Sequence, residues 1–400
     1  MKKNNSRLKP TTPPIYYYGK QSINNSDVEA VAKTLLSSLI TQGPVSQQFE
    51  HELSAYFGAR HTSVVANGTA GLHLIALGLG WKQNDLVITT PITFLASANC
   101  AIYAGADVDF VDIDSSSYTI DPNKLEDKII KLSKSKKRIK AVVAVDYAGH
   151  PCDWKSLHYL KEKYGFQLVN DFCHALGAEY KNSKHYAAKY ADAVNLSFHP
   201  VKHITTGEGG AILTNDDELD KSIKTLRTHG MTKDPEILLQ NDGPWYYEMH
   251  EVGFNYRITD FQCALGINQL KKLDGFLVER RKVAQHYNEA FANIDTIKIP
   301  KISKGVKHAY HLYPLLIDFK KLKIDKLALY NNLKNDRVVF QVHYIPVHLQ
   351  PYYKNRYGYK RGDFPVAENF YDSEISIPIY PGLKKADLNY ISKTIIKNLG

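Results

Sequence analysis

Hydrophobic positions near the start of the chain follow helical spacing. In VSQQFEHELSAYF, over residues 45–57, apolar side chains recur three and four positions apart, which predicts an amphipathic helix. A shorter helix is predicted over 25–36, where Ser26 and Glu29 have the spacing of a capping box. Two helices are therefore expected before the first strand.

From residue 62 onward, short runs of β-branched residues alternate with helical stretches. The runs are TSVVAN, LVITT, VDFVDI, AVVAVDY and FQLVND, and a helix over 155–164 is predicted between the last two. This alternation persists to about Leu213. It predicts an α/β fold with a mostly parallel, doubly wound sheet that carries helices on both faces.

The pattern changes in the last third of the chain. Long helices are predicted over 259–273 and 276–294, and a final helix from Lys385 onward. Between them, HAYHLYPLLIDF and VVFQVHY have the composition of antiparallel strands. This part is expected to form a smaller α+β unit.

These patterns divide the chain into three parts. We expect a flexible arm over 1–20, a large domain over 21–270 and a small C-terminal domain over 271–400. The arm, MKKNNSRLKPTTPP, has no apolar core and does not resemble a secretory signal. The longest apolar runs, such as 72–79, are too short to span a bilayer, so a cytoplasmic protein without a membrane partner is expected.

The net charge of +10 on 400 residues raises the question of a nucleic-acid partner. The basic residues are dispersed, and the densest run, over 131–140, has the pattern of a solvated helix end. No nucleic-acid partner is therefore expected. An overall positive field favours anionic small substrates instead.

Cysteine and histidine spacing indicates neither disulfides nor a metal site. No pair of the four cysteines has CxxC spacing and each lies in a core-like stretch, so buried free thiols in a reducing cytoplasm are predicted; they are Cys100, Cys152, Cys173 and Cys263. His343 and His348 could ligate a metal, but no carboxylate or thiolate lies near them in sequence to complete a set. No metal is expected.

Ligands of open parallel sheets bind at the carboxyl ends of the strands, and a glycine turn follows the first strand. In VVANGTAGLHL, Gly68 and Thr69 come after this strand and open a helix. Free N–H groups and the helix dipole suit a phosphate at this point. A turn without a ligand is the alternative.

A second candidate feature lies in QLVNDFCHALGAEY, where Asp171 ends a strand and His174 follows. A carboxylate at a buried strand end is costly unless it meets a cation or several donors. Asp171 is therefore either a ligand-binding carboxylate or a cap of the next turn.

The third feature is SFHPVKHITTGEGG, which sets Lys202 between two strands. Ser197 precedes the lysine, Thr205 and Thr206 follow it as further donors, and Gly209 and Gly210 indicate close packing at the next strand. A solvent-exposed loop lysine is the alternative.

The three features together specify pyridoxal 5′-phosphate. Its phosphate needs donors such as Gly68, Thr69 and Ser197, its ring nitrogen needs a carboxylate such as Asp171, and its aldehyde needs an amine such as Lys202. This order along the chain is that of aspartate-aminotransferase-like enzymes. Phe94, in TTPITFLASAN, could stack on the ring or belong to the core.

The sequence also resembles the DegT/StrS-type sugar-nucleotide aminotransferases over nearly its whole length. The matching stretches are LITQGPVSQQFE, NGTAGLHLIAL, TTPITFLASAN, VDYAGHP, NDFCHALGA, SFHPVKHITTGEGGAILTND, RTHGM, GFNYRITDFQCALG and HYIPVH. The resemblance implies a PLP-dependent aminotransferase of fold type I, with a seven-stranded type of sheet and a sugar-nucleotide substrate.

The resemblance also assigns roles. It implies that Lys202 holds the cofactor covalently, that Asp171 holds its ring nitrogen and that His174 lies against the ring near its hydroxyl. Gly68, Thr69 and Ser197 take the phosphate, and Asn255 reaches the cofactor phosphate of the neighbouring subunit in a homodimer with a shared active site. The implied sugar-nucleotide pocket consists of Tyr18, Thr41, His343, Tyr344, Ile345 and Pro346.

Within the family, HYIPVHLQPYY and FYDSEISIP are most similar to transaminases of the pseudaminic acid route. That similarity implies a UDP-linked 4-keto-6-deoxy sugar aminated at C4, with glutamate as donor. The alternatives are another UDP- or dTDP-4-keto-6-deoxy sugar as substrate, a PLP-dependent dehydratase or lyase, and a non-catalytic PLP-binding regulator.

Sugar dehydratases of the family have histidine in place of Lys202. Asn170 stands where many relatives have an acidic residue, and His203 has no assigned role.

Overall fold

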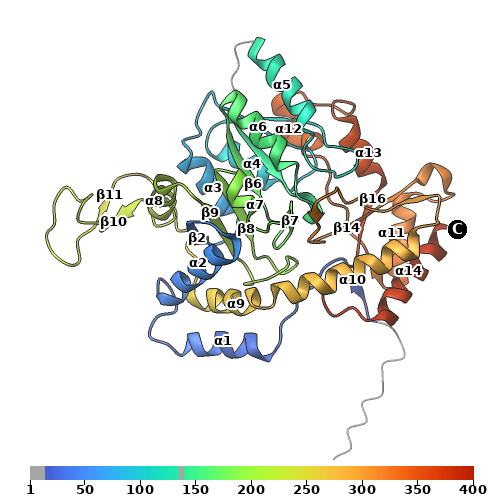
Figure 1. Ribbon diagram of the computed structural model, residues 1–400, viewed down its shortest axis with the longest axis horizontal. Coiled ribbons are helices and arrows are strands. Elements are labelled where there is room, and N and C mark those ends of the chain that lie inside the picture. The colour runs from blue at the N-terminus through green and yellow to red at the C-terminus, as the bar shows by residue number, and fades with distance from the viewer. Residues whose placement is uncertain (1–13, 135–138) are drawn as a thin grey trace, which may run out of the picture.

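The computed structural model describes residues 14–134 and 139–400 (Figure 1). Within these residues, the largest sheet has seven strands in the order β2-β9-β8-β6-β5-β3-β4. Only β9 runs against the others, since it is antiparallel to both β2 and β8. The strands are β2 (His61–Val65), β3 (Leu86–Thr89), β4 (Asp107–Phe110), β5 (Ile139–Val145), β6 (Gln167–Asp171), β8 (Ala193–Ser197) and β9 (Gly210–Thr214).

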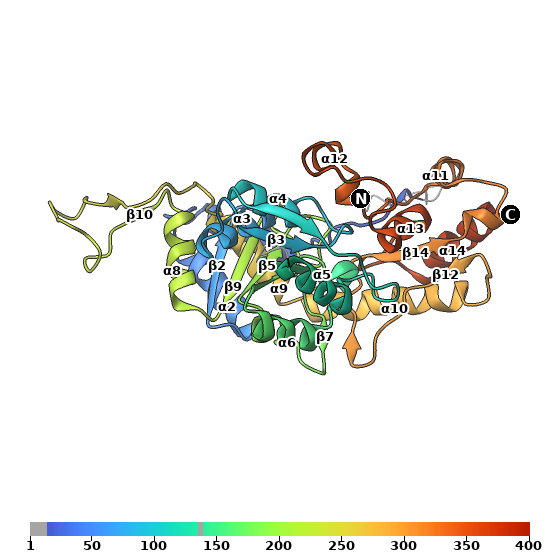
Figure 2. The ribbon, with the colours of Figure 1, turned by 90° about the horizontal axis from the view of Figure 1, so that it is seen from above.

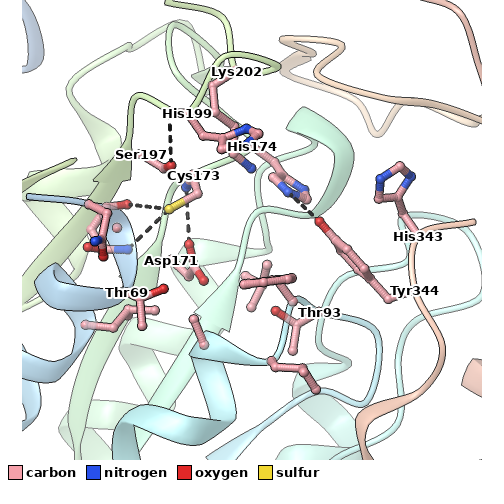
Figure 3. Close-up of a pocket in the computed structure, with 18 of the residues that line it drawn as sticks. Thr69, Thr93, Asp171, Cys173, His174, Ser197, His199, Lys202, His343 and Tyr344 are labelled. Atoms are coloured by element: carbon pink, nitrogen blue, oxygen red, sulfur yellow. Dashed lines mark hydrogen bonds between the residues drawn. The ribbon is translucent and has the colours of Figure 1, made fainter. Parts of the chain in front are cut away.

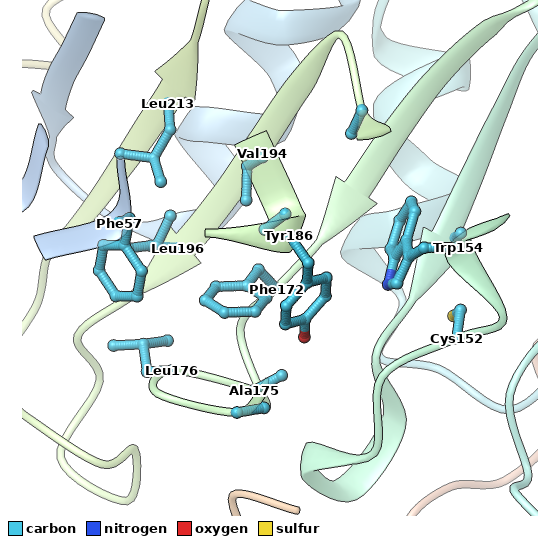
Figure 4. Packing of buried hydrophobic residues seen from close by; sticks show 14 of the residues in the cluster. Phe57, Cys152, Trp154, Phe172, Ala175, Leu176, Tyr186, Val194, Leu196 and Leu213 are labelled. Atoms are coloured by element: carbon cyan, nitrogen blue, oxygen red, sulfur yellow. The ribbon is translucent and has the colours of Figure 1, made fainter. Parts of the chain in front are cut away.

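Helices cover both faces of this sheet, and a separate apolar layer lies under each set. One layer packs α2 (Pro44–Phe57), α5 (Pro122–Lys134), α6 (Trp154–Tyr164), α7 (Tyr186–Tyr190) and α9 (Asp260–Leu270) on the sheet (Figure 4). The other contains α3 (Gly68–Gly78), α4 (Ala96–Tyr103) and α8 (Asp217–Leu226). Alternate residues of β5 enter opposite layers, for example Val142 and Val143. The predicted doubly wound α/β fold is confirmed.

The helix α1 (Asn25–Leu35) begins with a different cap from the one predicted. The N-cap is Asn24, whose side chain accepts from the Ser26 N–H at 3.1 Å, and its own N–H donates to Asp27 Oδ2 at 2.9 Å. The predicted pairing of Ser26 with Glu29 is therefore wrong. Asn24 is the last residue with extended backbone, so the capping box is shifted by two positions.

A smaller antiparallel sheet, in the order β12-β14-β16, forms the C-terminal part. Its strands are β12 (Ile297–Lys298), β14 (Tyr313–Ile317) and β16 (Glu374–Ile377), and it packs with α10 (Leu273–Phe291), α11 (Lys326–Asn335) and α14 (Lys385–Leu399). The prediction of a strand for HAYHLYPLLIDF is confirmed by β14. The prediction of an antiparallel strand for VVFQVHY holds at one position only: Gln341 pairs antiparallel with Ser376 in an isolated bridge. The strand that forms, β15 (Val338–Val339), is parallel to β1 (Tyr16–Tyr17). Beyond β15, the backbone leaves the strand path and binds Ser376 and Glu374.

Part of the expected N-terminal arm is ordered. Residues 1–13 lie outside the described residues, but Tyr16 pairs with Val338 and its hydroxyl donates to Asp387 at 2.7 Å. The expectation of a flexible arm is therefore wrong for β1. Long helix α10 runs from α9 to the small sheet (Figures 1 and 2), and the boundary placed at 270/271 stays a prediction.

The remaining elements lie at the periphery. β10 (Met231–Thr232) and β11 (Glu248–Met249) form a hairpin that projects far from the sheet (Figure 2). The others are β7 (Glu179–Tyr180), β13 (Val306–Lys307), α12 (Pro351–Tyr357) and α13 (Pro365–Ser373). Among the described residues, no helix has the length and apolar content needed to cross a membrane.

Candidate active site

The carboxyl ends of β2, β3, β6 and β8 open onto one cavity of about 930 Å³ (Figure 3). Its other wall comes from the segment 341–345 and from Tyr18. This is the edge at which open parallel sheets bind ligands. Eleven of the predicted site residues line it: Tyr18, Gly68, Thr69, Phe94, Asp171, His174, Ser197, Lys202, His343, Tyr344 and Ile345.

The N-terminus of α3 offers free donors to this cavity. Asn67 caps the helix by accepting from the Ala70 N–H at 2.8 Å. In the described part of the chain, the N–H groups of Gly68 and Thr69 have no hydrogen-bond partner, and Ser197 lies beside them with its hydroxyl hydrogen unused. Such a group of donors at a helix N-terminus fits an anion.

Close packing at this turn explains two of the glycines. A Cβ on Gly68 would lie 3.1 Å from the Cβ of Ser197. A Cβ on Gly210 would lie 2.7 Å from the carbonyl carbon of Asn67 and 2.8 Å from the Gly68 nitrogen. Gly210 thus lets β9 lie directly against the turn that carries the free donors.

Asp171 is held by a chain of hydroxyls. Its Oδ2 accepts from Ser97 Oγ at 2.6 Å, and Ser97 Oγ lies 2.7 Å from Thr93 Oγ1. Its Oδ1 accepts only a 3.3 Å bond from the Cys173 N–H. The carboxylate is 5 % exposed and has no cationic partner among the described residues, so one oxygen is left to meet a ligand.

Ser97 and Thr93 were not predicted from the sequence. Both hydroxyls lie in TTPITFLASAN, but Thr93 belongs to the bend before α4 and Ser97 to its first turn, so the spacing alone does not show that they meet. The contact of Ser97 with Asp171 joins residues that are 74 positions apart.

Lys202 is partly buried in the cavity wall, so the alternative of an exposed loop lysine is wrong. No acceptor within the described residues binds its Nζ. Burial lowers the pKa of Lys202 because it disfavours the charged amine, and the nearby charge of Asp171 partly opposes this effect. The free amine is thus more available than that of a surface lysine.

His174 is a neutral imidazole with both nitrogens engaged. Its Nδ1 accepts from the Ala148 N–H at 3.3 Å, so its Nε2–H donates to the Tyr344 hydroxyl at 3.1 Å. Burial first, and then the charge of Lys202, hold the pKa of His174 well below its usual value. His311, which was not predicted, also lines the cavity, and its ring centroid lies 4.3 Å from that of His174.

The residues next to Lys202 serve the scaffold. The buried His203 points away from the cavity and bonds through Nε2 to the Ala309 carbonyl at 3.1 Å. The hydroxyls of Thr205 and Thr206 donate to the carbonyls of Phe198 and Glu208. The expectation that these threonines supply donors to a ligand is therefore wrong.

Three predicted site residues do not line the cavity of this chain. Thr41 pairs with Thr259 and Asn255 with Thr228 in isolated bridges, and both are exposed. Pro346 is buried, directly after the lining segment. Phe94 does line the cavity and is 55 % exposed, so its alternative assignment to the core is wrong.

The predicted cysteines and histidines can also be placed. All four cysteines are free thiols, and three of them are buried as predicted; the prediction of burial is wrong for Cys173, which is half-buried in the cavity wall. His348 and His343 do not point at a common metal site, because Nε2 of His348 hydrogen-bonds to Glu368 at 3.0 Å. Within the described residues, no group of histidine, cysteine and acidic side chains is arranged to hold a metal ion.

Comparisons with known proteins agree with this geometry. Residues 21–396 match the model of the DegT/DnrJ/EryC1/StrS aminotransferase family. The UDP-4-amino-4,6-dideoxy-N-acetyl-beta-L-altrosamine transaminase of Campylobacter jejuni is 38% identical over 382 residues, which cover 96% of this chain and 97% of the relative.

Two solved structures share the fold. PseC of Helicobacter pylori, an aminotransferase involved in the biosynthesis of pseudoaminic acid, has a TM-score of 0.87 and 31% identity over 96% of this chain and 99% of its own. The PLP form of the sugar aminotransferase Spr1654 from Streptococcus pneumoniae has a TM-score of 0.86 and 27% identity, over 97% of this chain and 98% of its own.

The chain therefore belongs to the DegT/DnrJ/EryC1/StrS aminotransferase family. It is a PLP-dependent sugar aminotransferase of fold type I. The cavity fits this cofactor: it offers free N–H donors for a phosphate, a carboxylate oxygen for a ring nitrogen and an unpaired amine for an aldehyde.

Proposed function

We propose that the enzyme transfers the amino group of L-glutamate to C4 of a UDP-linked 4-keto-6-deoxy-N-acetylhexosamine. The product is then UDP-4-amino-4,6-dideoxy-N-acetyl-β-L-altrosamine, an intermediate of the pseudaminic acid route. The names of the Campylobacter and Helicobacter relatives support this choice of substrate. The observation that carries the proposal is the convergence of the free Lys202 amine, Asp171 and the donors of α3 on one cavity.

The cofactor is held at three points in this proposal. The N–H groups of Gly68 and Thr69, with the Ser197 hydroxyl, bind the phosphate, and the helix dipole of α3 adds to that attraction. Asp171 pairs with the protonated ring nitrogen, and Lys202 carries the cofactor covalently. PLP, when bound, supplies an electron sink for the carbanion that forms at the substrate carbon.

Lys202 then acts as the general acid and base. Its amine would remove the proton from Cα of glutamate in the first half-reaction, and it would return a proton to C4 of the sugar in the second. The lowered pKa of Lys202 favours this exchange near neutral pH. His174 would lie against the ring near its hydroxyl, and the exposed ring of Phe94, which lines the same cavity, would stack on it.

The sugar nucleotide is proposed to bind along Tyr18, His343, Tyr344 and Ile345, with Pro346 fixing the end of that segment. Asn255 is exposed and outside the cavity of its own chain. We therefore propose that it reaches the cofactor phosphate of a second copy, so that a homodimer shares two sites. Thr41, which is exposed as well, would join the sugar pocket across the same interface.

The test is an incubation of PLP-loaded enzyme with glutamate and a panel of UDP- and dTDP-linked 4-keto-6-deoxy sugars, followed by NMR of the products. We expect an amine at C4 in the L-altro configuration, formed from the UDP-linked N-acetyl sugar alone. Preference for a dTDP sugar, or another configuration at C4, contradicts the proposed substrate. A deoxygenated product formed without glutamate indicates a dehydratase.

A further inference from the structure

His343 has one polar atom that is free to meet a ligand. Its backbone N–H donates to Glu374 Oε2 at 2.9 Å, and its carbonyl accepts from the Tyr147 hydroxyl at 2.5 Å. Its Nδ1 lies 2.9 Å from Ser376 Oγ. Of its polar atoms, Nε2 has no partner among the described residues, and the ring lines the cavity (Figure 3). A ligand beside His343 would therefore meet Nε2, which can act either as a hydrogen-bond donor or as an acceptor.

The number of hydrogens shared by Glu374, Ser376 and His343 determines whether Nε2 donates or accepts. Ser376 has a single hydroxyl hydrogen, and its Oγ lies 2.5 Å from Glu374 Oε1. When Glu374 is ionised, Ser376 donates to it and accepts from Nδ1–H, so Nε2 is an acceptor. When Glu374 is protonated, it donates to Ser376, which donates to Nδ1, so Nε2 carries the hydrogen and is a donor.

Both states are accessible in this environment. Burial raises the pKa of Glu374 to about 8, although the bonds from Ser376 and His343 and the charge of Lys326 act in the other direction. Burial and then the charge of Lys202 lower the pKa of His343 to about 3, so its ring stays neutral and responds by changing tautomer.

The other titratable groups that face Glu374 are Lys326 of α11 and the hydroxyls of Tyr147 and Tyr344. Burial lowers the pKa of Lys326, whereas the charge of Glu374 raises it, and the charge of Lys326 in turn opposes protonation of Glu374. Burial raises the pKa of both tyrosines well above the usual value, so both stay neutral. Glu374 and His343 are thus the pair that can exchange a proton through Ser376.

We propose that Glu374 and Ser376 are positioning residues that switch His343 Nε2 between acceptor and donor, so that one ring serves both half-reactions. An amino donor arrives as an ammonium ion, which presents hydrogens, whereas the keto sugar presents a carbonyl oxygen. The two ligands exchange at the same place and need opposite partners there. This inference rests on the proposed function in placing that exchanging group beside His343.

The proton balance closes over one turnover. A proton passes from the ammonium nitrogen to His343 Nε2, the Nδ1 proton passes to Ser376 Oγ, and the Ser376 proton passes to Glu374 Oε1. The ammonium becomes a nucleophilic amine, the carboxylate becomes a carboxylic acid, and the imidazole remains neutral. The same three transfers in reverse return the proton to the amino group of the sugar product.

The direct test follows the His343 tautomer in PLP-loaded enzyme that carries ¹⁵N-labelled histidine, with His343→Gln used to assign the signals. In the unaltered enzyme, Nδ1 and Nε2 should exchange protonated and unprotonated shifts between about pH 7 and 9. Glu374→Gln should fix Nε2 as the donor, Ser376→Ala should abolish the titration, and Ser376→Thr should retain it. Signals that do not titrate in the unaltered enzyme, or that titrate equally in Glu374→Gln, overturn the proposal.

Kinetics give a second readout that a merely structural role would not produce. Glu374→Gln should slow the glutamate half-reaction roughly 10²-fold, the scale of a lost acid–base step, and slow the keto-sugar half-reaction far less. Ser373→Ala, a change at an exposed neighbouring hydroxyl, is the control and should alter neither. Equal losses in both half-reactions overturn the proposal. If the His343 signals titrate but the enzyme aminates no keto sugar, the result supports the switch and contradicts the proposed function.

Discussion

Ser97 donates a 2.6 Å hydrogen bond to Oδ2 of Asp171 and thereby leaves Oδ1 facing the cavity. Ser97 is fully buried, and Thr93 lies 2.7 Å from it on the cavity side. The carboxylate that the proposal assigns to the cofactor ring is therefore fixed in rotation by a residue that does not line the cavity.

Replacing Ser97 with alanine tests this relationship. The change leaves Oδ2 without a donor, and an unsatisfied buried acceptor costs about 1–3 kcal/mol. We expect the half-reaction with glutamate to slow by roughly tenfold to a hundredfold, while PLP still binds. Stopped-flow absorbance of the bound cofactor measures both effects. Ser133→Ala, at an exposed helical serine, is the control, and an unaltered rate in Ser97→Ala contradicts the role.

Gly210→Ala tests the packing under the phosphate turn. Its new Cβ would meet the Asn67 and Gly68 backbone at 2.7–2.8 Å, so β9 or the turn must move. We expect a loss of about 1–3 kcal/mol in the free energy of unfolding, together with weaker PLP binding. Gly275→Ala, in α10 where a Cβ meets nothing within 4 Å, should leave PLP binding unchanged and should not lower the free energy of unfolding, because alanine favours a helix more than glycine by about 1 kcal/mol. PLP affinity that stays equal in the two variants argues against this account of the turn.

The sequence predicts those parts of this site that depend on local pattern. Gly68 opens the helix after one predicted strand and Asp171 ends another, so their meeting at the carboxyl edge of the sheet could be expected from the sequence. The bond from His203 to Ala309 spans 106 positions, and no local signal distinguishes His203 from a ligand-binding histidine. Likewise, the β-branched VVFQVHY satisfies a strand pattern, but the bonds that draw its end toward Glu374 come from a distant strand.

Acid should destabilise the fold through its buried histidines. Burial holds the pKa values of His174, His203, His308 and His311 well below normal. Groups with a lowered folded-state pKa contribute stability that is present above the unfolded value near 6.5 and is lost as pH falls below it. At pH 5.5, one unit below that value, each of these histidines should lower the free energy of unfolding by about 1.4 kcal/mol. Denaturant titrations at pH 7.5 and 5.5 should show that the free energy of unfolding falls by less in His311→Gln than in the unaltered enzyme. Equal decreases in the two proteins would contradict this account.

The contribution of Glu374 to stability should depend on pH in the opposite direction. Its pKa rises from an ordinary 4.5 to about 8 on folding, because burial disfavours its charge. Its contribution to stability is therefore complete below pH 4.5 and declines as pH rises toward 8. The neutral Glu374→Gln variant lacks this decline. Its free energy of unfolding, relative to the unaltered enzyme, should increase from pH 5 to pH 8 in denaturant titrations, and a constant difference would contradict the raised pKa.

The most direct measurement of the central claim is borohydride reduction of the PLP-loaded enzyme, followed by peptide mass spectrometry. Reduction makes the bond between PLP and its lysine permanent, so the modified residue can be identified. We expect the added mass on the peptide that contains Lys202, and none after Lys202→Ala, with the exposed Lys354→Ala as a control that retains it. Stable labelling of another lysine in the unaltered enzyme would contradict the assignment of this cavity as the active site.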